Sequence, residues 1–266
     1  KYAQSIVLRS GARLTFLMAH RKVRATGTAP YLWHNTQDTD TLLDAFKRGQ
    51  IPRSLQSTLE APVLANVDFD VCLYSGSLMP SVVAETFRQT YDLILSGAPK
   101  GSLLRRLFNP ISLTQLINEA KAPVFLVPAA SRFNEIQHIT YAVDLTAYDP
   151  FVIQQVKEIA GLFDAKLTVA HVNAEATAAQ RETYLNSLER TISDTLDYPK
   201  VYYKFFDHAD PFRGIKKFVD HSNSQMLAMI NRSPLSWREL FSAKSMTMRM
   251  TQQSRVPILA FRKKDV

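Results

Sequence analysis

"RRLFNPISLT" at residues 105–114 and "RELFSAKSMT" at residues 238–247 are two versions of one ten-residue phrase. Arg, Leu, Phe, Ser and Thr are kept between them, and Ser245 lies 133 residues after Ser112. Because the chain has 266 residues, this repeat divides it almost in half, and each half is long enough to bury a core of its own. The sequence therefore predicts two copies of one structural unit.

The second half alternates predicted strands with predicted helices. "HITYAVDL" at 138–145 alternates in polarity and is β-branched, whereas 150–163 carries apolar residues at helical spacing. The same criteria predict further strands at 165–172, 201–207, 225–230 and 256–261, and helices near 175–195, from Asp210, and near 237–252. Strands that alternate with helices pair in parallel through right-handed crossovers. The order predicts an α/β fold with a doubly wound parallel five-stranded sheet.

The first half repeats this pattern, with one element fewer. Strands are predicted at 12–19, 70–76, 91–97 and 122–128, so we expect one domain at 1–129, a second at 138–266, and a linker around 130–137. The strand at 12–19 begins 11 residues after Lys1, whereas its counterpart at 165–172 begins 27 residues after His138. About 16 residues, a strand and a turn, are therefore absent from the first copy, and the first strand of such a sheet is normally central. We expect the natural protein to begin upstream of Lys1.

Composition and charge narrow the classes of function. The chain is 46% hydrophobic and 21% charged, and no apolar run approaches the roughly 18 residues that span a bilayer, so no membrane partner is expected. Cys72 is the single cysteine and lies in an alternating stretch, which predicts a buried strand residue, no internal disulfide and a cytoplasmic location. The net charge of +8 raises nucleic acid as a partner, but the basic residues form small scattered groups, which favours a solvated surface instead.

The duplicated unit resembles the universal stress protein family in its tandem two-domain form. The residues that carry the resemblance are "ARLTFLMAH" (12–20) and "AKLTVAHV" (165–172), "FNPISLTQLI" (108–117) and "FSAKSMTMRM" (241–250), and "APVFLVP" (122–128) and "VPILAF" (256–261). The resemblance implies two sheets of the adenine nucleotide alpha hydrolase-like type. It also implies that the last strands of the two copies pair with each other, as an internal pseudo-dimer, while a further homodimer stays open.

Family members that bind ATP carry a Gly-x2-Gly-x9-Gly-Ser pattern after strand four and an Asp at the end of strand one. Such glycines let backbone N–H groups approach phosphate oxygens at a helix N-terminus. The matching positions are Ala98, Gly101, Ile111 and Ser112 in the first half, and Asn231, Pro234, Lys244 and Ser245 in the second, with Asp144 as the acid. One glycine of six survives. Ile111 adds a branched side chain and Pro234 removes a donor, although Lys244 offers a point charge. The pattern predicts a degenerate nucleotide cleft.

Other candidate sites have ordinary structural interpretations. Ser112 and Ser245 are each suited to cap the helix that follows. "FDHADP" at 206–211 gathers acids and a histidine, but no second cluster completes a metal site, and a capped helix start explains it better. His20 and His171 end matching strands. No nucleophile, base and orienting acid fall at recognisable spacing, so the sequence gives no positive signal for catalysis.

Three functional hypotheses follow. The first is a non-enzymatic tandem universal stress protein, a stress-response or regulatory binding protein with a degenerate nucleotide cleft and no cofactor. The second is an ATP-binding or slowly ATP-hydrolysing member that uses the first half through Gly101 and Ser112. The third is a protein that binds another small metabolite in the same cleft, with Asp144 and Lys244 as polar anchors. Co-purified nucleotide, or a thermal shift with ATP and magnesium, separates the first from the second.

Overall fold

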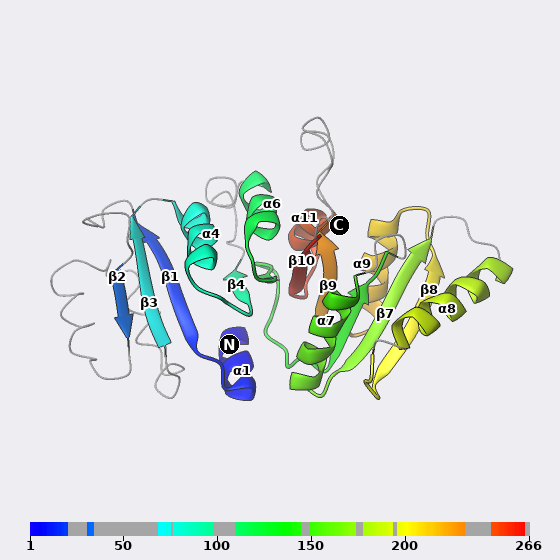
Figure 1. Cartoon of the computed structure of the whole chain (residues 1–266). Helices are drawn as coiled ribbons and strands as arrows, with labels where there is room; N and C mark the ends of the chain where they lie inside the picture. The colour runs from blue at the N-terminus through cyan, green and yellow to red at the C-terminus, as the bar shows by residue number, and fades with distance from the viewer. Residues whose placement is uncertain are drawn as a thin grey trace. The chain divides into compact units, whose positions relative to one another are not determined.

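The protein is an α/β structure in which strands alternate with helices along most of the chain (Figure 1). The computed structural model describes residues 1–20, 31–34, 69–75, 77–97, 110–144, 149–173, 178–193, 196–231 and 246–263. The chain divides into two compact units, Lys1–Gln89 and Thr90–Val266. The predicted fold class is confirmed, and each unit is described separately below.

The second half of the chain forms the predicted doubly wound sheet. Its strands are β6 (His138–Ala142), β7 (Lys166–Asn173), β8 (Val201–Asp207), β9 (Met226–Asn231) and β10 (Ile258–Arg262), and they lie in the order β10-β9-β6-β7-β8 with every neighbouring pair parallel. The first strand of this half is therefore central. The chain winds outward from it to β8, returns to β9 on its other side, and ends at β10, which is the doubly wound pattern.

Four described helices connect these strands: α7 (Pro150–Leu162), α8 (Ala178–Ser193), α9 (Pro211–His221) and α11 (Met246–Gln253). Figure 1 shows α7 and α8 on the near side of the sheet and α9 on the far side, and α9 contacts α11. The start of α9 is the one that the sequence predicts. Oδ1 of Asp210 accepts hydrogen bonds from the backbone N–H of Phe212 (2.9 Å) and of Arg213 (3.3 Å), and Pro211 is the first helical residue.

Two strands from the first half extend this sheet to seven strands. β4 (Ile94–Gly97) pairs in parallel with β5 (Val124–Val127), and β5 pairs antiparallel with β10, with Leu259 opposite Phe125. The last strands of the two halves thus pair with each other, as expected from the resemblance. α6 (Pro110–Glu119) contacts β10 and α11. The compact unit 90–266 therefore includes the end of the first half, and the repeat boundaries at 129 and 138 stay a prediction.

The unit Lys1–Gln89 contains a three-stranded sheet. α1 (Tyr2–Ser10) ends at Gly11, whose φ of 65° is the left-handed conformation that glycine tolerates best, and β1 (Leu14–His20) follows. β1 pairs in parallel with β3 (Phe69–Ser75), and α4 (Leu78–Arg88) follows β3 and contacts β1. β2 (Tyr31–His34) lies antiparallel to β3, and the sequence analysis did not predict it.

Burial follows the predicted strands. Ile139, Tyr141, Leu167, Leu227 and Leu259 are fully buried in the seven-stranded sheet, and burial of such side chains is the main favourable contribution to folding. Cys72 is buried in β3, as its alternating surroundings predict. Among the helices that the structure describes, none combines the length and the apolar character that crossing a bilayer requires.

Candidate functional site

Two of the polar residues that the sequence singles out, Asp144 and Asn231, lie at the carboxyl edge of the second-half sheet. β6 pairs with β7 on one side and with β9 on the other, so the winding direction reverses between β6 and β9. Ligands of open α/β sheets bind outside the carboxyl ends of the strands at such a point. Asp144 follows β6 by two residues and is half-buried, and Asn231 is the last residue of β9. The structure places these two predicted site residues at the ends of neighbouring strands.

Asn231 is fully buried, and its side chain is hydrogen-bonded to a residue of α6. Its Nδ2 donates a hydrogen bond of 2.8 Å to Oδ1 of Asn118 on α6. Within the described part of the chain, Oδ1 of Asn231 has no hydrogen-bond partner. The position at which ATP-binding family members have a glycine therefore holds a side chain that is packed against α6.

The other predicted site residues are placed only in part. Ile111 and Ser112 are the second and third residues of α6. Because a helix cap is the residue before the first helical one, the interpretation of Ser112 as a cap is wrong. Pro110 begins α6 instead, a position that suits proline because the first N–H groups of a helix have no partner within it. Ala98, Gly101, Pro234, Lys244 and Ser245 lie outside the described residues.

His171, near the end of β7, lies beside the end of β6. Its Nδ1 is 2.9 Å from the backbone oxygen of Val143, which can only accept, so Nδ1 carries the proton and donates. The ring of His171 lies 5.3 Å from that of Phe205, which in turn stacks on Tyr184 at 5.7 Å with 5° between the planes. The sequence marks His171 only as a strand-end residue. The structure adds a fixed tautomer and an aromatic neighbour.

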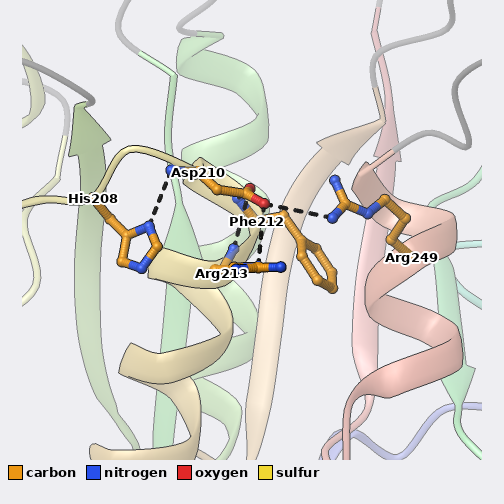
Figure 2. A network of polar contacts seen from close by, with 5 residues as sticks. All are labelled: His208, Asp210, Phe212, Arg213 and Arg249. Carbon is orange, nitrogen blue, oxygen red and sulfur yellow. Dashed lines mark hydrogen bonds and ion pairs between the residues drawn. The ribbon is translucent and has the colours of Figure 1, made fainter.

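A network at the start of α9 was not found from the sequence (Figure 2). Oδ1 of Asp210 caps the helix, while its Oδ2 lies 3.7 Å from Nε of Arg213 and 3.7 Å from Nη2 of Arg249. Cζ of the Arg249 guanidinium lies over the ring of Phe212, 3.8 Å from its centre. Asp210 also donates its backbone N–H to Nδ1 of His208, at 3.0 Å. The network joins the first turn of α9 to α11.

The electrostatics of Asp210 favour its charged form. Partial desolvation acts to raise the pKa of this carboxyl group, but the hydrogen bonds from the backbone N–H of Arg213 and Phe212 and the charges of Arg249 and Arg213 outweigh it. The pKa of Asp210 is therefore lowered from its ordinary value. Among the residues that the structure describes, no three of His, Cys, Asp and Glu are grouped so that they could hold a metal ion.

Gly214 fixes how closely α9 approaches the sheet. A Cβ atom added there would lie 2.9 Å from Cβ of His208 and 2.9 Å from Cγ1 of Val172 on β7. Neither atom is the end of a flexible chain, so a larger residue would push α9 outward. The absence of a side chain at Gly214 thus keeps the Asp210 network at its observed distance from β7.

A second polar cluster lies at the opposite, amino edge of the sheet. Nδ1 of His138 donates to the backbone oxygen of Ser222 (2.9 Å), and the hydroxyl of Thr168 donates to Nε2 of the same ring (2.8 Å). Both ring nitrogens are satisfied in the neutral form. Desolvation lowers the pKa of His138, the contact with Ser222 opposes this, and the charge of Lys166 adds to the lowering. We interpret this cluster as structural.

Comparison with known proteins identifies the fold. No family model matches the chain, and no curated protein matches it either. The solved universal stress protein from Archaeoglobus fulgidus DSM 4304 covers 98% of this chain and 90% of its own, with a TM-score of 0.65 at 14% identity. A putative universal stress protein from Pseudomonas aeruginosa UCBPP-PA14 gives a TM-score of 0.63 at 15% identity, over 98% and 86% of the two chains. A functionally unknown protein from Pseudomonas aeruginosa PAO1 gives 0.60 at 15%, with the same coverage. At these identities the likeness concerns architecture, and the chain has the universal stress protein fold over nearly its whole length.

Proposed function

We propose that the chain is a non-catalytic binding protein, with a stress-response or regulatory role, whose nucleotide site is degenerate. Its two copies of the unit are residues 1–129 and 138–266. The observation that carries the proposal is the buried side chain of Asn231, held by Asn118, at the carboxyl end of β9. A phosphate cradle of the glycine type needs bare backbone at this point, because its donors are main-chain N–H groups.

The carboxyl edge keeps groups that suit a small polar ligand. Asp144 lies at the end of the central strand, and His171 presents a ring whose Nδ1 is already committed to Val143. Carboxylate and imidazole groups fix the orientation of a bound ligand by hydrogen bonding. Neither of them forms part of a recognisable nucleophile and base arrangement, which fits binding without catalysis. We place the protein in the cytoplasm, which its single, buried cysteine supports.

Two measurements on the purified protein test this proposal. Nucleotide released by denaturation is expected to be absent, and the melting temperature in millimolar ATP with magnesium is expected to match that in an equal concentration of inorganic tripolyphosphate with magnesium. The tripolyphosphate control removes any general effect of a polyanion on a basic protein. A shift that is clearly larger with ATP than with tripolyphosphate would show adenine-specific binding, and the proposal would then give way to an ATP-binding function.

A further inference from the structure

Two arginines near the start of α9 form ion pairs with Asp210 but keep unused N–H donors within the described structure. Arg213 is the third residue of α9, and Arg249 lies in the first half of α11. Each guanidinium carries N–H donors in a planar fork that matches an oxyanion. Both guanidinium groups approach Oδ2 of Asp210 only to 3.7 Å, which is an ion pair but too long for a hydrogen bond, and no hydrogen bond from either side chain is found within the described residues. Two guanidinium groups thus lie beside one carboxylate, and neither donates a hydrogen bond to it.

The charge balance of this group is positive. Oδ1 of Asp210 is used by the backbone N–H groups of Phe212 and Arg213, so only Oδ2 faces the two guanidinium groups. Two arginines and one carboxylate leave a net charge of +1. The positive end of the α9 dipole adds to it. One carboxylate therefore does not neutralise both guanidinium groups.

The two arginines differ in how they are held. Cζ of Arg249 lies over the Phe212 ring, 3.8 Å from its centre, and this cation–π contact limits the movement of the guanidinium group. The Arg213 side chain is 76% exposed and reaches solvent freely, whereas that of Arg249 is 39% exposed. Figure 2 shows both arginine side chains beside Asp210. Arg249 is thus held by its contact with Phe212, whereas the exposed Arg213 side chain is free to move toward a ligand.

We propose that Arg213 and Arg249 form an oxyanion site that binds the phosphate group of a small ligand. The inference deepens the proposed binding role and rests on it, because it names the chemistry of the ligand. Side-chain guanidinium groups, rather than backbone N–H groups of a glycine loop, hold the anion. Charge-assisted bonds of this kind are roughly twice as strong as neutral ones, and bidentate contacts add geometric selectivity.

The test measures anion binding to the full chain by titration calorimetry at low ionic strength. The probes are inorganic phosphate, pyrophosphate, ATP and adenosine, which distinguish a free phosphate from the phosphate end of a nucleotide. The phosphate-bearing probes are expected to bind and adenosine is not. Arg213→Gln and Arg249→Gln are each expected to weaken phosphate binding roughly tenfold. Lys217→Gln removes the same charge from an exposed site on the same helix and is the matched control, expected to bind as the parent does.

The Asp210→Asn variant distinguishes an anion site from a purely structural salt bridge, because only an anion site predicts a change in phosphate affinity. Asparagine caps helices as well as aspartate, so α9 is expected to stay folded, while loss of the negative charge is expected to tighten phosphate binding about fivefold. The inference is overturned if no phosphate-bearing probe binds, if the Arg213→Gln variant binds as the parent does, or if Lys217→Gln weakens binding equally. Because Arg213 is largely exposed, its replacement tests the site even if Arg249→Gln fails to fold. These outcomes are separate from the comparison of ATP with tripolyphosphate that tests the proposed function.

Discussion

The two halves of the chain carry the same repeat but build their sheets differently. In the second half β6 pairs with both β7 and β9, and so joins two pairs of strands into one sheet. In the first half the corresponding strands are β1 with β3 and β4 with β5, and they lie in two separate sheets. The described first half has no counterpart of β6. In the second half, the central strand β6 is therefore the element that joins β7 and β8 to β9 and β10 in one sheet.

The helices that follow the third strand of each half differ as well. α9 begins with Asp210, whose carboxylate accepts two backbone hydrogen bonds. The N-cap of α4 is Ser77, which makes no side-chain cap hydrogen bond. α4 instead carries a buried glutamate, Glu85, which accepts a hydrogen bond from the hydroxyl of Tyr74. At this position the second half therefore has a carboxylate that caps the helix, whereas the first half has a buried carboxylate within the helix.

The largest effect expected from this difference concerns the reactivity of Cys72. Burial, followed by the nearby Glu85, raises the pKa of the Cys72 thiol from 9.0 to about 12. Because the thiolate is the reactive form, labelling of the native protein by a thiol reagent at pH 8 is expected to be about 1000-fold slower than that of an unfolded control. Rapid labelling of the native chain, at the rate of the unfolded control, would show that the first unit opens readily and that Cys72 is not protected.

The strand pairing between the halves can be weakened at Phe125. This residue on β5 is 1% exposed and lies opposite Leu259 of β10. Phe125→Ala is expected to lower the free energy of unfolding by about 3–5 kcal/mol, because it removes a large buried side chain and leaves a cavity. Urea denaturation followed by circular dichroism measures this change. Leu95→Ala on β4, where the side chain is 37% exposed, is the control and is expected to cost much less. Equal losses for the two variants would contradict the assignment of β5 and β10 as a buried seam.

The close approach of α9 to the sheet can be tested at Gly214. Gly214→Ala is expected to destabilise the protein by about 1–3 kcal/mol, since the new Cβ would lie 2.9 Å from His208 and from Val172. Gly161→Ala on α7 is the matched control, because no atom lies within 4 Å of a Cβ added there. It is expected to stabilise the helix by roughly 0.5–1 kcal/mol, as alanine favours helices over glycine. The melting temperatures of the two variants separate the steric effect of the new Cβ from the preference of helices for alanine. If both variants melt at a higher temperature than the parent, α9 is not packed as closely against His208 and Val172 as the structure shows.

The smallest expected effect is the pH dependence contributed by His138. Its pKa is lowered in the folded protein, so the unfolded chain binds the proton more tightly. The stability contribution of the neutral ring is therefore complete above the ordinary value of 6.5, and it is lost as the pH falls from there toward the lower folded pKa. Urea midpoints between pH 7.5 and 5.5 are expected to fall more for the parent chain than for His138→Gln. Parallel pH profiles would contradict this origin.

The sequence predicts local features well and distant partners poorly. β8 is predicted at 201–207 and observed there, since its alternation is clear and Asp210-Pro211 marks the following helix. The short strand β2 is missed, because its antiparallel pairing with β3 depends on contacts about 40 residues away in the chain. Ser112 is misjudged as a cap because the repeat suggests a helix start, whereas Pro110 begins α6.

The residues of the candidate site also fall into those that the sequence indicates and those that only the structure shows. Asp144 and Asn231 are both found through the resemblance, which aligns them with the first-strand acid and the first glycine of the family pattern. The bond from Asn231 to Asn118 and the approach of Arg249 to Asp210 join residues that no periodicity relates, so the structure is needed to find them. Spacing within one element is encoded locally, whereas contacts between elements depend on how the whole sheet is wound.

The antiparallel pairing of β5 with β10 also bears on how the protein responds to dilution. Both strands belong to one polypeptide, so they meet at an effective concentration set by the connecting chain, of the order of millimolar, whatever the amount of protein in the tube. Each of them is also flanked on its other side, β5 by β4 and β10 by β9. Separate subunits would lose the β5–β10 pairing on dilution, whereas a single chain keeps it at any protein concentration. Any assembly of whole chains therefore has to use a different surface.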